Sequence, residues 1–69
     1  MKVVTEVAGK VWKIEVQAGA VVAADEVILI LESMKMEIPV VAPRAGRLAV
    51  LHVKEGDALN EGDLIAVLE

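Results

Sequence analysis

The sequence repeats itself without a gap at an offset of 37 residues, and this repeat constrains the fold more than any other feature. Residues 3–32 recur as residues 40–69 with nine identical positions, and conservative pairs such as Lys10 with Arg47 lie between them. A solenoid needs at least three repeats, so two copies of a unit of about 30 residues are too few. We therefore expect one domain over residues 1–69. Its two half-folds, 3–32 and 40–69, would be related by a pseudo-twofold axis and joined by a hairpin over 33–39.

Each half has the pattern of short β-strands. β-Branched residues dominate, and turns rich in Gly or Asp interrupt them at close intervals. Residues 10–16 alternate between apolar and polar, except at Trp12, while residues 27–32 and 64–69 are almost continuously apolar, as in strands buried on both faces. Pro39 and Pro43 exclude a helix in the middle of the chain. The pattern predicts six to eight antiparallel strands in a flattened barrel, with a central core that includes Val27, Ile28, Ile30, Leu31, Leu64, Ile65, Val67 and Leu68.

Composition excludes several kinds of function. The absence of cysteine removes disulfides, thiolate nucleophiles and cysteine-based zinc sites. A net charge of −4 argues against a nucleic-acid partner. No apolar run exceeds five residues, whereas a membrane-spanning helix needs about 20. A single histidine, His52, and a single serine, Ser33, leave no metal site and no serine nucleophile. We expect a cytoplasmic domain without a membrane or metal partner, too small for a conventional enzyme pocket.

One segment stands out chemically, at the join between the two halves. It reads Glu32-Ser33-Met34-Lys35-Met36-Glu37 and follows an apolar strand, so it should form a tight hairpin turn. Such turns usually contain Asn-Gly, Asp-Gly or another glycine-rich pair, but this one holds a lysine between two methionines. Methionines often fill gaps in cores, and a lysine at a turn is often merely solvated. The segment is nevertheless the one place that the repeat does not duplicate, which favours a functional role.

The run Glu32–Met36 resembles the biotin-attachment motif of biotinyl domains, usually written Ala (or Val)-Met-Lys-Met. The flanking segments 8–11, 42–48 and 53–64 resemble the family in register, so the similarity covers nearly the whole chain. It implies the biotinyl/lipoyl fold, an all-β flattened barrel or sandwich of two four-stranded antiparallel sheets with Lys35 exposed at a hairpin tip. The chain is most similar to small stand-alone biotin/lipoyl attachment proteins, which are closer to it in size than the larger carboxyl carrier subunits, and to the biotin carboxyl carrier domain of biotin-dependent carboxylases. Two departures are Ser33, in place of a small apolar residue, and the gapless repeat, which leaves no room for an inserted thumb.

The resemblance implies a carrier rather than an enzyme. A lysine amine is mostly protonated at pH 7, and nothing nearby in the sequence would act as its base. In the family, a biotin protein ligase activates biotin as its adenylate and attaches it to the lysine, here Lys35, through an amide. The resulting swinging arm carries a carboxyl group between biotin carboxylase and carboxyltransferase sites. Apolar Met34 and Met36 are expected to mark the lysine for the ligase, and Glu32, Ser33 and Glu37 complete the candidate recognition set.

Two alternatives remain open. A lipoyl carrier uses the same fold and a lysine to shuttle acyl or aminomethyl groups, with lipoate as the cofactor. Lipoyl domains usually show Asp-Lys-Ala at this position, so the two methionines favour biotin. An unmodified β-barrel that serves as an interaction module is the third possibility, and Lys35 at the tip argues against it.

Overall fold

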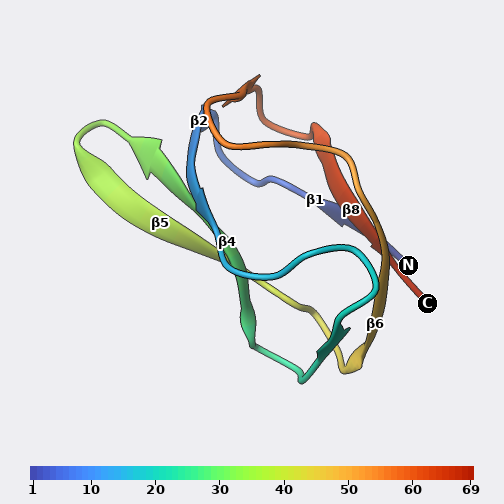
Figure 1. Ribbon diagram of the computed structural model, residues 1–69. Coiled ribbons are helices and arrows are strands. Elements are labelled where there is room, and N and C mark those ends of the chain that lie inside the picture. Colours follow the sequence, from blue (N-terminus) through green and yellow to red (C-terminus); the bar gives the residue numbers. More distant parts are fainter.

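Eight short strands form two four-stranded antiparallel sheets in the computed structural model, which describes all residues 1–69 (Figure 1). The sheet orders are β1-β8-β6-β3 and β5-β4-β2-β7. The prediction of an all-β fold with two such sheets is confirmed. The strands are β1 (Lys2–Val4), β2 (Gly9–Ile14), β3 (Val21–Val22), β4 (Val27–Ser33), β5 (Met36–Val41), β6 (Gly46–Leu51), β7 (Ala58–Leu59) and β8 (Leu64–Leu68).

The repeat of 37 residues is visible in the strand pairing. Val3 pairs with Ala66 in one sheet, and the residues at the same offset, Val40 and Leu29, pair in the other. Each sheet takes two strands from each half of the chain, so neither half has a sheet of its own. The connection between β2 and β3, residues 15–20, matches the connection between β6 and β7, residues 52–57, and contains no inserted segment.

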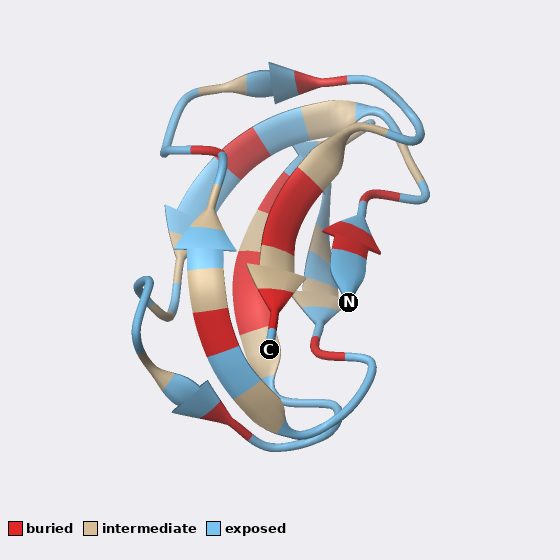
Figure 2. Cartoon of the chain, turned by 90° about the vertical axis from the view of Figure 1, so that its right-hand side faces the viewer, coloured by how far each residue is buried: buried red, intermediate tan, exposed pale blue.

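The core lies between the two sheets and is shared by both halves (Figure 2). A β-bulge at Ile28 shapes it, because Val27 pairs with Val41 while Leu29 pairs with Val40. The extra residue lets consecutive side chains, Ile28 and Leu29, both point inward, and both are fully buried. The predicted core is therefore correct at Ile28, Leu31, Ile65 and Leu68 and wrong at Val27, Ile30, Leu64 and Val67, which are only half-buried. It is also incomplete, because nine of the 13 buried core residues were not in it, Leu29 and Ala66 among them.

A second bulge explains why Trp12 interrupts the alternation in β2. Val11 pairs with Leu31 and Lys13 pairs with Ile30, so Trp12 is the extra residue, and it is half exposed. The strand predicted over residues 10–16 ends at Ile14 instead. The next two amides, of Glu15 and Val16, both donate to the carbonyl of Ile28 and so leave the regular ladder.

The two chain ends lie side by side at the end of the barrel away from the β4–β5 hairpin (Figure 1). The Met1 amine donates to the Leu68 carbonyl at 2.6 Å, and the Leu68 amide donates to the Met1 carbonyl at 2.7 Å. No helix of the chain is long and apolar enough to span a membrane.

Candidate functional site

A two-residue turn, Met34-Lys35, joins β4 to β5. Ser33 pairs with Met36 directly below the turn, and Glu32 pairs with Glu37 below them. The predicted tight turn is confined to these two residues, and residues 36–39 of the hairpin lie in β5. The hairpin projects from the barrel and places Lys35 at its tip (Figure 1).

Both turn residues adopt a backbone conformation that bulky side chains rarely occupy. The φ angles are 51° at Met34 and 64° at Lys35, the signature of a type I′ turn. Each non-glycine residue in this region costs about 1–2 kcal/mol. No sequence signal reveals this conformation, since the usual Asn or Gly is missing. Elsewhere positive φ angles occur only at residues that tolerate them, namely Asp25, Gly19, Gly56 and Gly62.

The side chains around the turn are open to solvent. Met34 is 91% exposed and Met36 is 62% exposed, so neither methionine belongs to the core. Lys35 is also exposed. The two ion pairs of the structure involve Lys13 and Arg47, and the Lys35 ammonium has no partner. The amine is thus free to meet another protein.

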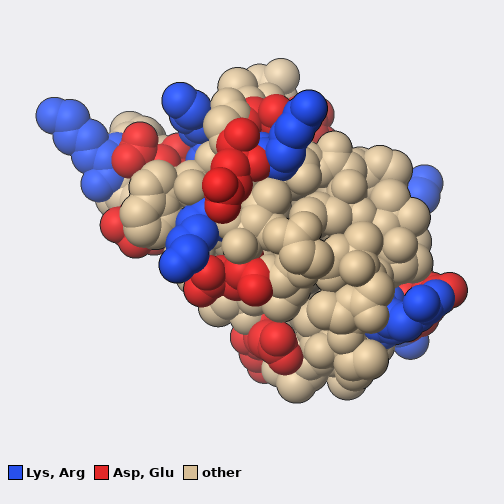
Figure 3. Space-filling model, viewed as in Figure 1, with Lys and Arg blue, Asp and Glu red and all other residues tan.

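The projecting hairpin has two chemically different sides. Glu32 and Glu37 lie directly opposite each other on one side, and both are exposed. Like charges in this arrangement repel, and a basic partner would relieve the repulsion. Ser33 and Met36 point to the other side, which continues the buried face of Leu31. The space-filling view shows basic atoms extending from the hairpin tip, with acidic atoms beside them (Figure 3).

Strand β2 packs closely against the base of the hairpin at Gly9. A Cβ atom added to Gly9 would lie 2.9 Å from the carbonyl oxygen of Glu32. Beside this contact, a hollow of about 250 Å³ is lined by Lys10, Trp12 and Glu32, among others. Trp12 was not expected to lie near the hairpin. The repeat offered a signal, because the position at the same offset is Ala49.

Outside the hairpin, the structure contains a groove and an exposed histidine. No group of three or more His, Asp or Glu side chains is close enough to hold a metal ion. A groove of about 410 Å³ runs between residues 2–7 and 38–41, and its titratable side chains are Lys2 and Glu6. His52 is exposed just past the end of β6. Lys35 remains the candidate functional residue, because it is exposed and unpaired at the hairpin tip.

Known proteins are similar to nearly the whole chain, including the β4–β5 hairpin. The family model described as "Biotin-requiring enzyme" matches residues 1–68. A "Biotin/lipoyl attachment protein" from Bacillus subtilis (strain 168) is 47% identical over 68 residues, which are 99% of this chain and 93% of that protein. A "Biotinylated protein TB7.3 homolog" from Mycobacterium leprae (strain TN) is 43% identical over 63 residues, 91% of this chain and 89% of that protein.

A solved structure shares the fold. The crystal structure of the Kluyveromyces lactis urea carboxylase matches with a TM-score of 0.94 and 33% sequence identity. The match covers 100% of this chain but only 6% of the carboxylase. The similarity is therefore to one small part of a large enzyme.

Proposed function

The chain belongs to the biotin/lipoyl attachment family, and on this premise we propose that it is a biotin carrier domain that is biotinylated on Lys35. The family match and the biotinylated relative favour biotin over lipoate as the covalent cofactor. The observation that carries the proposal is the free, exposed amine of Lys35 at the tip of a projecting hairpin, between two exposed methionines.

The residues around Lys35 fit a covalently attached group. The amine has no partner in the chain, so amide formation breaks no existing contact. Biotin, when attached, supplies reversible carriage of a carboxyl group. The protein contributes position, since the β4–β5 ladder fixes the Lys35 backbone while the side chain stays free to move between partners.

A biotin protein ligase is the partner that we propose for the attachment itself. Met34 and Met36 offer it adaptable apolar contacts on either side of the lysine. The facing carboxylates of Glu32 and Glu37 would attract a basic surface on the ligase and speed the encounter. Ser33, paired with Met36, keeps the neighbourhood of the lysine small.

Carboxylase components are the partners that we propose for the loaded carrier. The urea carboxylase that shares this fold contains the matching domain as 6% of its length. We propose that biotin carboxylase and carboxyltransferase sites on other domains or chains perform the chemistry. The present chain then acts as a non-catalytic carrier, because Lys35 has no base or acid partner of its own.

Biotinylation in vitro tests the proposal. The purified apo-protein is incubated with a biotin protein ligase, biotin and ATP, and its intact mass is followed over time. We expect one biotinyl group per chain, located on Lys35 by peptide mapping. A parallel reaction with a lipoate ligase measures the competing lipoyl function, and we expect slower modification there.

Two variants make the assignment specific. Lys35→Arg keeps the positive charge but removes the acceptor amine, so modification should stop while stability changes by less than about 0.5 kcal/mol. Lys54→Arg is the matched control, since Lys54 is an exposed lysine that lies outside the hairpin. Biotinylation of the Lys35→Arg protein at another lysine would contradict the site. Faster lipoylation than biotinylation of the unaltered protein would favour the lipoyl carrier.

A further inference from the structure

The oxidisable sulfur atoms of this chain are concentrated beside one lysine. The sequence contains three methionines and no cysteine, and two of the methionines flank Lys35. None of the 13 buried residues of the hydrophobic core is a methionine. An oxidant that attacks sulfur therefore acts on the surface of this protein, mainly at the hairpin tip.

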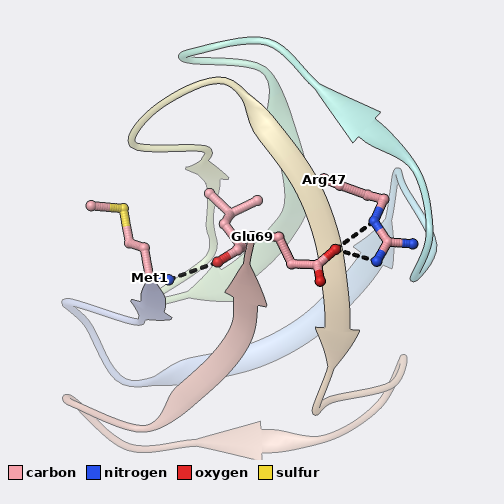
Figure 4. A network of polar contacts seen from close by, with 4 residues as sticks. Met1, Arg47 and Glu69 are labelled. Atoms are coloured by element: carbon pink, nitrogen blue, oxygen red, sulfur yellow. Dashed lines mark hydrogen bonds and ion pairs between the residues drawn. The ribbon is translucent and has the colours of Figure 1, made fainter.

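Solvent exposure ranks the three methionines. Met34 is 91% exposed, Met36 is 62% exposed and Met1 is 54% exposed. Met1 lies at the opposite end of the barrel, beside Leu68 (Figure 4). Since a peroxide must reach the thioether to react with it, Met34 should oxidise first. Met1 provides an internal reference far from Lys35.

We infer that Met34 and Met36 form a reversible oxidation site that controls whether the ligase can modify Lys35, an inference that rests on the proposed function. Hydrogen peroxide is the oxidant. The thioether sulfur attacks one peroxide oxygen, an S–O bond forms, the O–O bond breaks and water leaves. The sulfur loses two electrons and the peroxide gains them. Methionine sulfoxide reductases reverse the step, releasing the oxygen as water while a dithiol becomes a disulfide.

The chemical change at the tip opposes docking. A sulfoxide turns a flexible apolar side chain into a polar one with a strong acceptor oxygen. That oxygen must lose its water when an apolar ligase surface covers it, and this desolvation weakens binding. Two such groups flank the lysine, one on each side of it in the sequence, and both are exposed.

The same oxidation leaves the fold intact. Both methionine side chains lie outside the core, and the ladder below the turn depends on backbone pairing of Ser33 with Met36. Oxidation of buried methionines disrupts cores, but this core contains none. Slower biotinylation at unchanged stability therefore distinguishes reversible control by oxidation from oxidative unfolding.

Biotinylation kinetics before and after oxidation test the inference. The apo-protein is treated with hydrogen peroxide, and the sulfoxides are located by peptide mapping. Biotinylation by the ligase is then measured together with thermal unfolding. We expect Met34 to oxidise before Met36 and Met1, and kcat/KM to fall about tenfold or more. The unfolding midpoint should not move, and treatment with methionine sulfoxide reductases A and B should restore the rate.

A Met34→Leu/Met36→Leu double variant serves as the control, compared with itself before and after peroxide. Whatever its own rate, that rate should not change, since Met1 is its one remaining methionine. A fall in its rate would place the effect elsewhere and overturn the inference. Equal biotinylation of oxidised and untreated unaltered protein, or unfolding on oxidation, would overturn it too, and the proposed function would stand. No biotinylation of the untreated protein would instead remove the proposed function.

Discussion

The two ends of the barrel are built on equivalent pairings, yet only one of them is closed by a turn. Leu31 pairs with Ile38 below the Met34-Lys35 turn, and the residues at the same offset, Leu68 and Met1, form the last pair at the other end. That second pair is joined by a hydrogen bond of 2.6 Å from the Met1 amine (Figure 4) and by one of 2.7 Å from the Leu68 amide, although no turn joins it. At the hairpin end, the Met34-Lys35 turn is added to the same pairing. Its two bulky residues adopt positive φ angles that cost conformational energy, which fits a position kept for the proposed attachment.

Charged side chains differ between the same two ends. Arg47 and Glu69 form an ion pair, with the Arg47 Nε donating to the Glu69 carboxylate (Figure 4). The equivalent residues, Lys10 and Glu32, are register partners but form no ion pair. The open end thus neutralises its own carboxylate, while the hairpin end leaves Glu32 free. A free acidic group near the proposed acceptor lysine suits an encounter with a basic partner.

Truncation of a buried leucine in the shared core should lower the free energy of unfolding more than any other change, and by similar amounts at both ends. Leu31 and Leu68 occupy equivalent positions and are 0% and 1% exposed. We expect Leu31→Ala and Leu68→Ala each to lower the free energy of unfolding by about 2–5 kcal/mol, measured by urea denaturation. Losses below 1 kcal/mol at both positions would contradict a core shared by the two halves.

Substitution of the two equivalent glycines by alanine should lower the free energy of unfolding by different amounts at the two ends. A Cβ at Gly9 would lie 2.9 Å from the Glu32 carbonyl, and one at Gly46 would lie 2.7 Å from the Glu69 carbonyl. Glu32 is paired with strands on both sides, β2 and β5, whereas Glu69 is held by contacts with Arg47 alone. We expect Gly9→Ala to cost about 1–3 kcal/mol in denaturant unfolding, and Gly46→Ala less. A larger loss for Gly46→Ala would show that the open end is the more rigid one.

A residue at position 34 that favours the turn conformation should raise stability while slowing the modification of Lys35. Met34→Asn suits a positive φ angle, so we expect it to raise the free energy of unfolding by about 0.5–1 kcal/mol and to slow biotinylation. Asp25→Gly is the matched control, because Asp25 also has a positive φ angle, 66°, outside the hairpin. Unchanged biotinylation is expected there. Biotinylation of the Met34→Asn protein at the rate of the unaltered protein would show that the ligase does not recognise Met34.

Removal of single surface charges should give the smallest effects. At the open end it should alter stability alone, and at the hairpin end it should alter the ligase reaction alone. The Arg47–Glu69 pair is more than half exposed, so Arg47→Ala should change the free energy of unfolding by about 0–1 kcal/mol and leave biotinylation unaltered. Glu32→Gln should leave stability nearly unchanged and slow the ligase reaction at low salt, with the difference fading as salt rises. A salt-independent difference for Glu32→Gln would exclude electrostatic attraction as its role.

The fold was readable from the sequence because the repeat and the β-branched pattern pointed to the same arrangement. Its bulges were not, because one extra residue at Ile28 or Trp12 changes which side chains point inward without changing the hydrophobic pattern. The type I′ turn was also hidden, since Met34 and Lys35 disfavour the conformation that they adopt. The position of the candidate lysine could be predicted from the motif. That this lysine has no ion-pair partner could be seen only from the three-dimensional contacts.

The intact mass of the protein isolated from its native host, followed by peptide mapping, tests the central claim most directly. Biotin, lipoate and no addition give three distinct masses. We expect a chain carrying a single biotinyl group on Lys35, with the remaining lysines unmodified. A lipoyl group on Lys35, biotin on a different lysine, or no addition in cells that biotinylate other proteins would contradict the claim.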